Sequence, residues 1–152
     1  MILSDKLVLN LIKRKVKAMN RKILVIDDDP LILMIHEAVL ETQELTCSSE
    51  FFDDAGEAIN FMERGDNIDT QFLLLLDINM PMISGWDLLE EIQDSSLQKN
   101  VAVVMVTSSV NEGDRLKAGK YRNVVGFISK PLKDSDFDQL KSIEKLIPFF
   151  KN

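Results

Sequence analysis

The chain has 152 residues, of which 45% are hydrophobic and 28% charged, so it is long enough for one domain with a substantial core. Its net charge of -7 disfavours nucleic-acid binding, and its single cysteine, Cys47, excludes an internal disulfide, so we expect a reducing, cytoplasmic setting. No apolar run approaches the roughly 20 residues that span a bilayer, and residues 1–18 lack the features of a signal peptide.

Residues 1–20 form a basic leader that differs from the rest of the chain. As a helix, this leader would place three apolar residues on one face, Val8, Ile12 and Val16, and could contact a membrane. We favour a disordered leader or an upstream start codon instead, because Met19-Asn20-Arg21-Lys22 could itself begin a compact domain. We therefore expect no membrane contact through residues 1–20, and a single domain over residues 21–152.

From Arg21 onward, short apolar runs alternate with amphipathic segments. Five strand–helix units are predicted. The strands are, in chain order, Ile23–Ile26, Leu45–Phe52 (the weakest candidate), Phe72–Leu76, Val101–Val106 and Val124–Ile128. The helices that follow them are one from Pro30, one with Ala55, Ala58 and Met62, one after Gly85, a poor one over Val110–Lys120, and a last one with Phe137, Leu140, Ile143 and Ile147. Only Phe149–Asn152 follow, so we expect no output domain.

The predicted strands are apolar on both faces, which is typical of a parallel sheet covered by helices. Right-handed crossover connections between such strands give a doubly wound arrangement. The sequence therefore predicts an α/β fold, with five parallel strands and helices on both faces.

Polar residues recur where the predicted strands end. Asp27 and Asp28 follow the first strand, Asp77 the third, Thr107 the fourth and Lys130 the fifth. The carboxyl ends of parallel strands form a common ligand crevice, so these side chains are expected in one pocket. Carboxylates about 4 Å apart repel one another by a few kcal/mol, so positive charge is needed between them. Lys130 and a divalent cation are the candidates for this charge, and an all-oxygen ligand set favours Mg²⁺.

These strand ends resemble the receiver domain of two-component response regulators. The resemblance rests on four segments taken together: Ile23–Pro30 with its acidic residues, Asp77-Ile78-Asn79-Met80-Pro81 with Gly85, Val104–Ser108, and Phe127-Ile128-Ser129-Lys130-Pro131. It covers about Arg21 to Ile147. It implies a flavodoxin-like sheet with strand order 2-1-3-4-5, in a stand-alone regulator similar to the chemotaxis type.

The resemblance also implies a role for each matching residue. Asp77 would accept a phosphoryl group from a sensor histidine kinase or a phosphotransfer protein, in the presence of Mg²⁺. The implied metal ligands are Asp27, Asp28, Asp77 and the main-chain carbonyl of Asn79. The residues implied to bind the phosphoryl group are Thr107, Ser108 and Lys130. Phe127 would act in the conformational switch, and Asn79 and Ser109 would set the lifetime of the phosphoryl group. The Lys130–Pro131 bond is expected to be cis. Output would pass to an unidentified protein through the last two helices and the strand between them.

Two other functions fit parts of the pattern. One is a phosphatase or phosphotransferase with an aspartate nucleophile, although such enzymes of the haloacid-dehalogenase type carry a second aspartate where this chain has Asn79. The other is a receiver that only binds partners, although the residues that such chains lose are all present. We therefore expect a signalling module and not a conventional enzyme. The approach to the fifth strand, Ala118–Phe127, is longer and more basic than in the family.

Single residues outside this pattern have simpler interpretations. Asp29 is expected to cap the following helix. His36 is expected to be an exposed or partly buried structural residue, and Trp86 to pack over the loop before it.

Overall fold

The computed structural model describes residues 4–18, 20–108 and 111–152, with the backbone alone for residues 13–18. Its sheet contains β1 (Arg21–Ile26), β2 (Ser48–Phe52), β3 (Gln71–Leu76), β4 (Val101–Thr107) and β5 (Val124–Ser129). All four strand pairings are parallel, and the strand order is β2-β1-β3-β4-β5. The predicted fold class and strand order are therefore confirmed.

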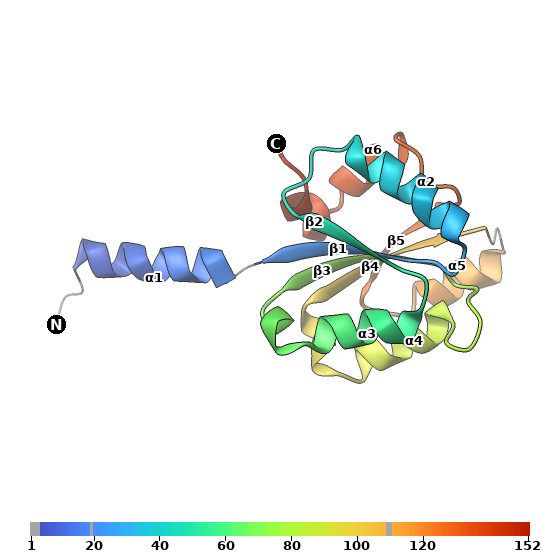
Figure 1. The fold of residues 1–152 in the computed structure, drawn as a ribbon, viewed down its shortest axis with the longest axis horizontal. Coiled ribbons are helices and arrows are strands. Elements are labelled where there is room, and N and C mark those ends of the chain that lie inside the picture. Colours follow the sequence, from blue (N-terminus) through green and yellow to red (C-terminus); the bar gives the residue numbers. More distant parts are fainter. Residues whose placement is uncertain (1–3, 19, 109–110) are drawn as a thin grey trace.

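Helices cover both faces of this sheet (Figure 1). They are α2 (Pro30–Glu41), α3 (Ala55–Glu63), α4 (Gly85–Gln93), α5 (Glu112–Ala118) and α6 (Asp136–Lys141), with short 3₁₀ helices at Gly65–Asn67, Ser96–Lys99 and Glu144–Phe149. The buried side chains of α3 and α4 pack on one face of the sheet, and those of α2 and α6 pack on the other. Alternate strand residues serve the two faces: Leu24 and Ile26 point to the first, Ile23 and Val25 to the second.

Several element boundaries follow from local chemistry. Asp29 caps α2, as predicted, because its Oδ1 accepts the Leu31 backbone N–H at 2.9 Å, and Pro30 takes the first helical position. Ser84 and Asp87 form a reciprocal capping box at the start of α4. These caps fix where each helix leaves the carboxyl end of the strand before it.

The last helix is shorter than predicted. α6 ends at Lys141, and the following residues form the 3₁₀ helix Glu144–Phe149. Pro148 lies in that segment and has no N–H to donate, which disfavours a continued α-helix. Ile147 is consequently 47% exposed and does not line a core-facing stripe.

The second strand also begins later than predicted. Leu45 makes only an isolated antiparallel bridge with Phe150, and the strand proper starts at Ser48. Thr46 donates its backbone N–H to the Phe149 carbonyl and its hydroxyl to the Pro148 carbonyl. This stretch is therefore bonded to the C-terminal segment and not to β1.

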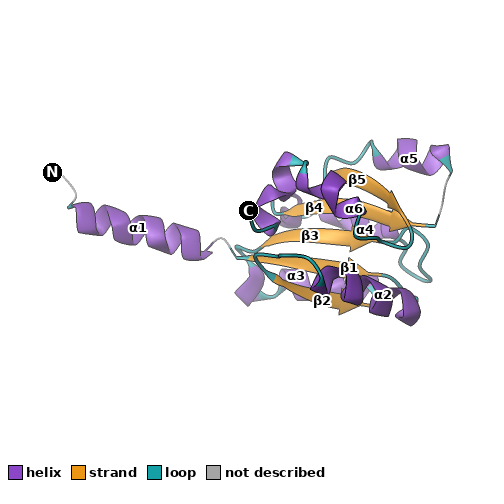
Figure 2. Cartoon of the chain, turned by 90° about the horizontal axis from the view of Figure 1, so that it is seen from above, coloured by secondary structure: helices purple, strands orange, loops and turns teal. Residues whose placement is uncertain are grey.

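The basic leader forms a helix, α1 (Asp5–Ala18), which is one of the two states that we considered for it, although not the one that we favoured. Ser4 begins the helix, since its hydroxyl accepts the Leu7 backbone N–H at 3.2 Å. In two perpendicular views α1 extends away from the body, beyond the amino end of β1 (Figures 1 and 2). Among the described helices, none has the length and apolar character that a membrane span requires.

Candidate functional site

The polar residues at the ends of the strands meet at one edge of the sheet, as predicted. β1 and β3 both end in an apolar run, Ile23–Ile26 and Phe72–Leu76, and the residue that follows each run is an acid: Asp27 after β1 and Asp77 after β3. β1 and β3 are direct neighbours in register, so Ile26 lies opposite Leu76. The pairing therefore carries Asp27 and Asp77 to the same place.

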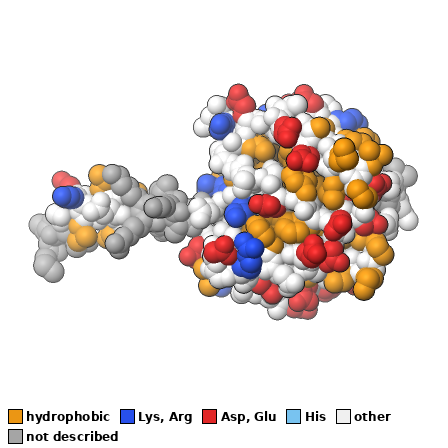
Figure 3. Space-filling model, in the orientation of Figure 1, with side chains coloured by type: hydrophobic (Ala, Val, Ile, Leu, Met, Phe, Trp, Pro, Cys, Tyr) orange, Lys and Arg blue, Asp and Glu red, His pale blue; other side chains and the backbone are white. Residues whose placement is uncertain are grey.

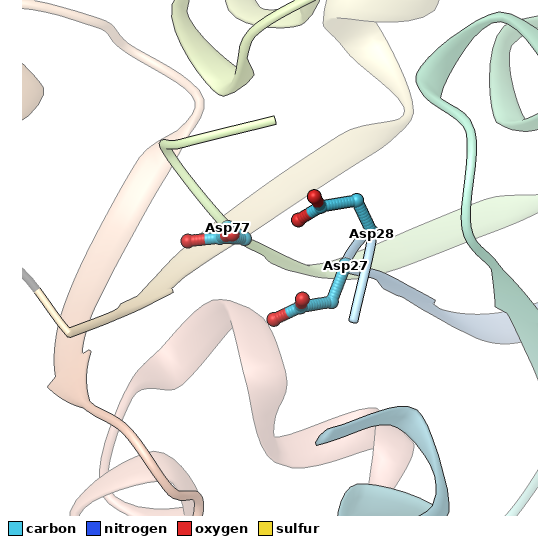
Figure 4. Close-up of side chains that lie close together, drawn as sticks. All are labelled: Asp27, Asp28 and Asp77. Carbon is cyan, nitrogen blue, oxygen red and sulfur yellow. The ribbon is translucent and has the colours of Figure 1, made fainter. Parts of the chain in front are cut away.

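Three carboxylates gather at this edge (Figure 4). One oxygen from each of Asp27, Asp28 and Asp77 lies within 4.8 Å of the other two. Asp27 and Asp77 are buried, at 2% and 3% exposure, whereas Asp28 is exposed to solvent. Such an arrangement has a closed inner side and an open outer side, through which a small ligand can enter.

Lys130 supplies the positive charge within the cluster. Its Nζ pairs with Asp77 Oδ2 at 3.1 Å and also with Asp27 Oδ2. Burial of the ammonium works against its charge, but its hydrogen bonds to Asp27 and Asp77 prevail and raise the pKa of Lys130. Lys130 thus supplies positive charge to two of the three carboxylates, as the sequence indicated that it should.

Asp77 keeps one oxygen without a protein partner. Its Oδ1 is buried and has no hydrogen-bond partner among the described residues. Burial raises the pKa of Asp77, and the hydrogen bond from Lys130 opposes this without overcoming it. A buried oxygen of this kind costs free energy unless a cation meets it, and hard oxygen ligands select Mg²⁺ or a similar ion.

Comparison with known proteins agrees with this geometry. The sequence model of the response regulator receiver domain matches residues 23–141. The chain belongs to the response regulator receiver family. Its sheet order is the CheY-like, flavodoxin-like one.

Two curated relatives and one solved structure illustrate the similarity. The chain is 28% identical over 127 residues to the two-component response regulator ARR17 of Arabidopsis thaliana, covering 78% of this chain and 81% of ARR17. It is 28% identical over 116 residues to the response regulator PleD of Caulobacter vibrioides, covering 76% of this chain but only 24% of PleD. The Mn²⁺-bound form of the response regulator Rcp1 has 26% identity and a TM-score of 0.62, covering 78% of this chain and 86% of Rcp1.

The remaining predicted residues of the receiver site lie around the carboxylates. Thr107 is fully buried as the last residue of β4, and its carbonyl accepts the Lys130 backbone N–H at 2.9 Å. Ser108 and Asn79 are exposed beside the site. Ser109 lies outside the described residues. The Lys130–Pro131 bond is cis, as predicted.

Phe127 lies within β5, three residues before Lys130. It is partly buried and packs against the core beneath α3 and α4. The guanidinium of Arg115, on α5, lies 4.9 Å from the centre of its ring. Phe127 thus contacts both the hydrophobic core and α5, the helix that follows β4.

Two supporting residues were not predicted from the sequence. A Cβ at Gly85 would lie 2.3 Å from the Asp77 carbonyl, so only glycine allows α4 to start so close to the site. His36 is buried and not exposed: its Nε2 accepts the Leu132 backbone N–H at 3.1 Å. The motif signalled Gly85 by its position, whereas nothing in the sequence indicated a partner for His36.

Trp86 packs differently from the prediction, which placed it over the loop before it. Its ring stacks on Tyr121 with centroids 6.0 Å apart, and Lys117 Nζ lies 4.4 Å from its centre. Tyr121 donates to Glu90 Oε1 at 2.7 Å. This contact joins α4 to the segment after α5.

Proposed function

We propose that this receiver domain is a phosphoacceptor switch whose phosphorylated residue is Asp77. The supporting observation is the environment of its carboxylate, which is buried, paired with Lys130 through one oxygen and open to a cation or a phosphoryl group through the other. The donor would be a phosphohistidine of a sensor kinase or a phosphotransfer protein, in the cytoplasm. Signalling would then occur by contact with another protein.

Asp27, Asp28 and Asp77, with the main-chain carbonyl of Asn79, would hold Mg²⁺. The carboxylates fit such an ion because their oxygens are mutually close and one of them is buried without a hydrogen bond. Bound there, the ion would neutralise charge that develops on the transferring phosphoryl group. The metal-bound structure of the similar regulator Rcp1 supports this assignment.

The residues of the chain have complementary tasks in the transfer. An oxygen of Asp77 would attack the phosphorus, forming an O–P bond while the N–P bond to the histidine breaks and the imidazole keeps the electron pair. Lys130, already bonded to Asp77, would turn to a phosphoryl oxygen. Thr107 would donate its hydroxyl to a second oxygen, and the Ser108 backbone N–H could donate to another.

The same step would set the output state. Movement of the Thr107 hydroxyl towards the phosphoryl group leaves space that Phe127 could enter, which would release its ring from beneath Arg115. α5, β5 and α6 form the face that would change and bind the downstream protein. Asn79 and Ser109, beside the phosphoryl group, would govern its lifetime.

Phosphorylation with acetyl phosphate and Mg²⁺, followed by intact-mass measurement, tests the proposal. We expect one phosphoryl group on the wild type and none on Asp77→Asn. Asp69→Asn is the matched control, because Asp69 is exposed and precedes β3 at the opposite end of the sheet. Equal incorporation into Asp77→Asn would contradict the assignment. Small phosphate esters should release no phosphate, and turnover of such esters would favour a phosphatase instead.

A further inference from the structure

The amino ends of the strands form a surface that the proposed function does not use. α1 joins β1 there, and the segments that lead into β4 and β5 reach the same end (Figure 1). A pocket of about 570 Å³ opens at this end, and its lining includes Lys99, Arg122 and Lys145. No aspartate or glutamate is among the described residues that line it. We call these three cations, with α1, the amino-end surface.

The cations of the amino-end surface are available to a partner. Lys99, Arg122 and Lys145 are all exposed. The ion pairs of the described residues, Arg64 with Asp66 and Lys130 with its two aspartates, include none of these three cations. The whole chain has a net charge of -7, so three unpaired cations around one pocket make the charge of this pocket opposite to that of the chain.

α1 adds exposed apolar side chains to these charges. Leu7, Val8, Leu9, Leu11 and Ile12 are between 40% and 54% exposed, and α1 extends away from the body that could have covered them. Hydrophobic side chains are visible on α1 in Figure 3, and lysine or arginine side chains lie among aspartate or glutamate side chains on the neighbouring part of the body. The sequence of α1 also contains five cations, Lys6, Lys13, Arg14, Lys15 and Lys17, against one acid, Asp5.

We propose that the amino-end surface binds the surface of an anionic lipid bilayer. A basic helix with exposed apolar residues is the kind that lies in the interface of such a bilayer, with its apolar side chains among the acyl chains and its cations at the headgroups. α1 has 14 residues, about 21 Å, which is too short to cross the hydrocarbon core but suits this position.

Other occupants match the observations less well. A second copy of α1 would cover the apolar residues but would bring two sets of five cations together. A nucleic acid would neutralise the cations but leave Leu11 and Ile12 in water. Of these three occupants, an anionic bilayer meets both the charge and the apolar side chains.

The amino-end surface contains two features that the receiver pattern does not account for. The first is α1, which lies outside residues 23–141 of the family match. The second is the long basic approach to β5, which contributes Arg122 to the pocket. We disfavoured membrane contact from the sequence because we expected disorder, and the helix removes that reason.

Vesicle sedimentation of the full chain tests this proposal. We expect the chain to pellet with vesicles of phosphatidylcholine and phosphatidylglycerol at low salt, and to remain in solution with pure phosphatidylcholine. Added salt should weaken the binding, since charges are screened within about 10 Å at 0.1 M. Equal pelleting with both lipids, or none with the anionic vesicles, would overturn the proposal.

Two sets of variants separate the apolar and the charged contributions. Leu11→Asn with Ile12→Asn should weaken binding at least about tenfold without a change in charge. The control is Leu31→Asn with Met34→Asn, at two apolar positions on α2 that are more exposed than Leu11 and Ile12, and it should bind as the wild type does. Neutralising Lys99, Arg122 and Lys145 to glutamine should weaken binding about fivefold for each charge, whereas Lys133→Gln should have no effect.

Three results would refute the surface itself. The first is unchanged binding of the Leu11→Asn, Ile12→Asn chain, checked for native circular dichroism. The second is a dimer without vesicles that depends on Leu11 and Ile12, which would assign the exposed apolar side chains to a second copy. The third is equal retention on single-stranded DNA and on vesicles. Phosphorylation of Asp77 is measured separately, so failure here leaves the proposed function unaffected.

Discussion

His36 and Leu132 connect α2 to the turn that follows the site lysine: the imidazole Nε2 accepts the Leu132 backbone N–H at 3.1 Å. Burial lowers the pKa of His36; the charge of Asp27 opposes this, and that of Lys130 adds to it. An imidazolium has no acceptor for the Leu132 N–H. The fold therefore requires a neutral His36, whose hydrogen-bond partner Leu132 lies two residues after Lys130.

We predict a pH-dependent loss of stability from this histidine. Because the pKa of His36 is lower in the folded chain than its ordinary 6.5, the unfolded chain binds the proton first. The contribution of His36 is therefore present above pH 6.5 and is lost as the pH falls towards the folded-state pKa. Urea unfolding of the wild type and of His36→Gln measures this, and their difference in unfolding free energy should shrink below pH 6.5. His36 is the only histidine, so a constant difference would contradict the prediction.

Lys130 should be essential to stability when no metal is bound. Lys130→Met leaves Asp27 and Asp77 buried without their counter-charge, which should cost about 3 kcal/mol of unfolding free energy in chelator. Adding Asp77→Asn to this variant should recover part of the loss, because one buried charge is then removed. Urea titration of the single and double variants measures both effects. A double variant no more stable than Lys130→Met would show that the repulsion between the aspartates is unimportant.

Mg²⁺ should stabilise the folded chain. At about 100 times its dissociation constant, the ion should add about 2.7 kcal/mol to the free energy of unfolding. Asp28→Asn should lose this gain with little change in chelator, because Asp28 is exposed. Thermal unfolding with and without Mg²⁺ measures the gain, and Asp69→Asn serves as the control that should retain it. An undiminished gain in Asp28→Asn would exclude Asp28 as a ligand.

Gly85→Ala should disrupt the packing of α4 on the site. The added methyl group would lie 2.3 Å from the Asp77 carbonyl, so the backbone must shift, at a cost of about 3 kcal/mol. Gly65→Ala is the matched control, since no atom lies within 4 Å of its Cβ position. Urea unfolding should separate the two variants, and acetyl phosphate labelling of Gly85→Ala should slow as well. Equal stability of the two variants would mean that the loop before α4 adapts freely.

Much of the fold and site could be predicted because the signals are local and repeated. β1, β3 and β4 each contain a continuous apolar run that is followed by a polar residue, so Asp27, Asp77 and Thr107 were recognisable without coordinates. Parallel pairing then requires that these ends meet. Asp28 and Lys130 followed from the same reasoning.

Other features depend on contacts between distant segments. The bond between His36 and Leu132 joins positions 96 residues apart, and the Thr46 hydroxyl reaches Pro148 across 102 residues. For α1, the apolar and basic residues were seen, but their spacing alone did not decide between a helix and disorder.

The parallel direction of all five strands separates the two proposed contacts by the full length of the sheet. Asp77 lies at the carboxyl ends of the strands and α1 joins their amino ends, so lipid bound through α1 would leave Asp77 open to a kinase. Lipid and kinase would thus bind at the same time without competing for residues. Such a receiver could collect phosphoryl groups while confined to a surface, where encounters with a membrane-embedded kinase are more frequent than in free solution.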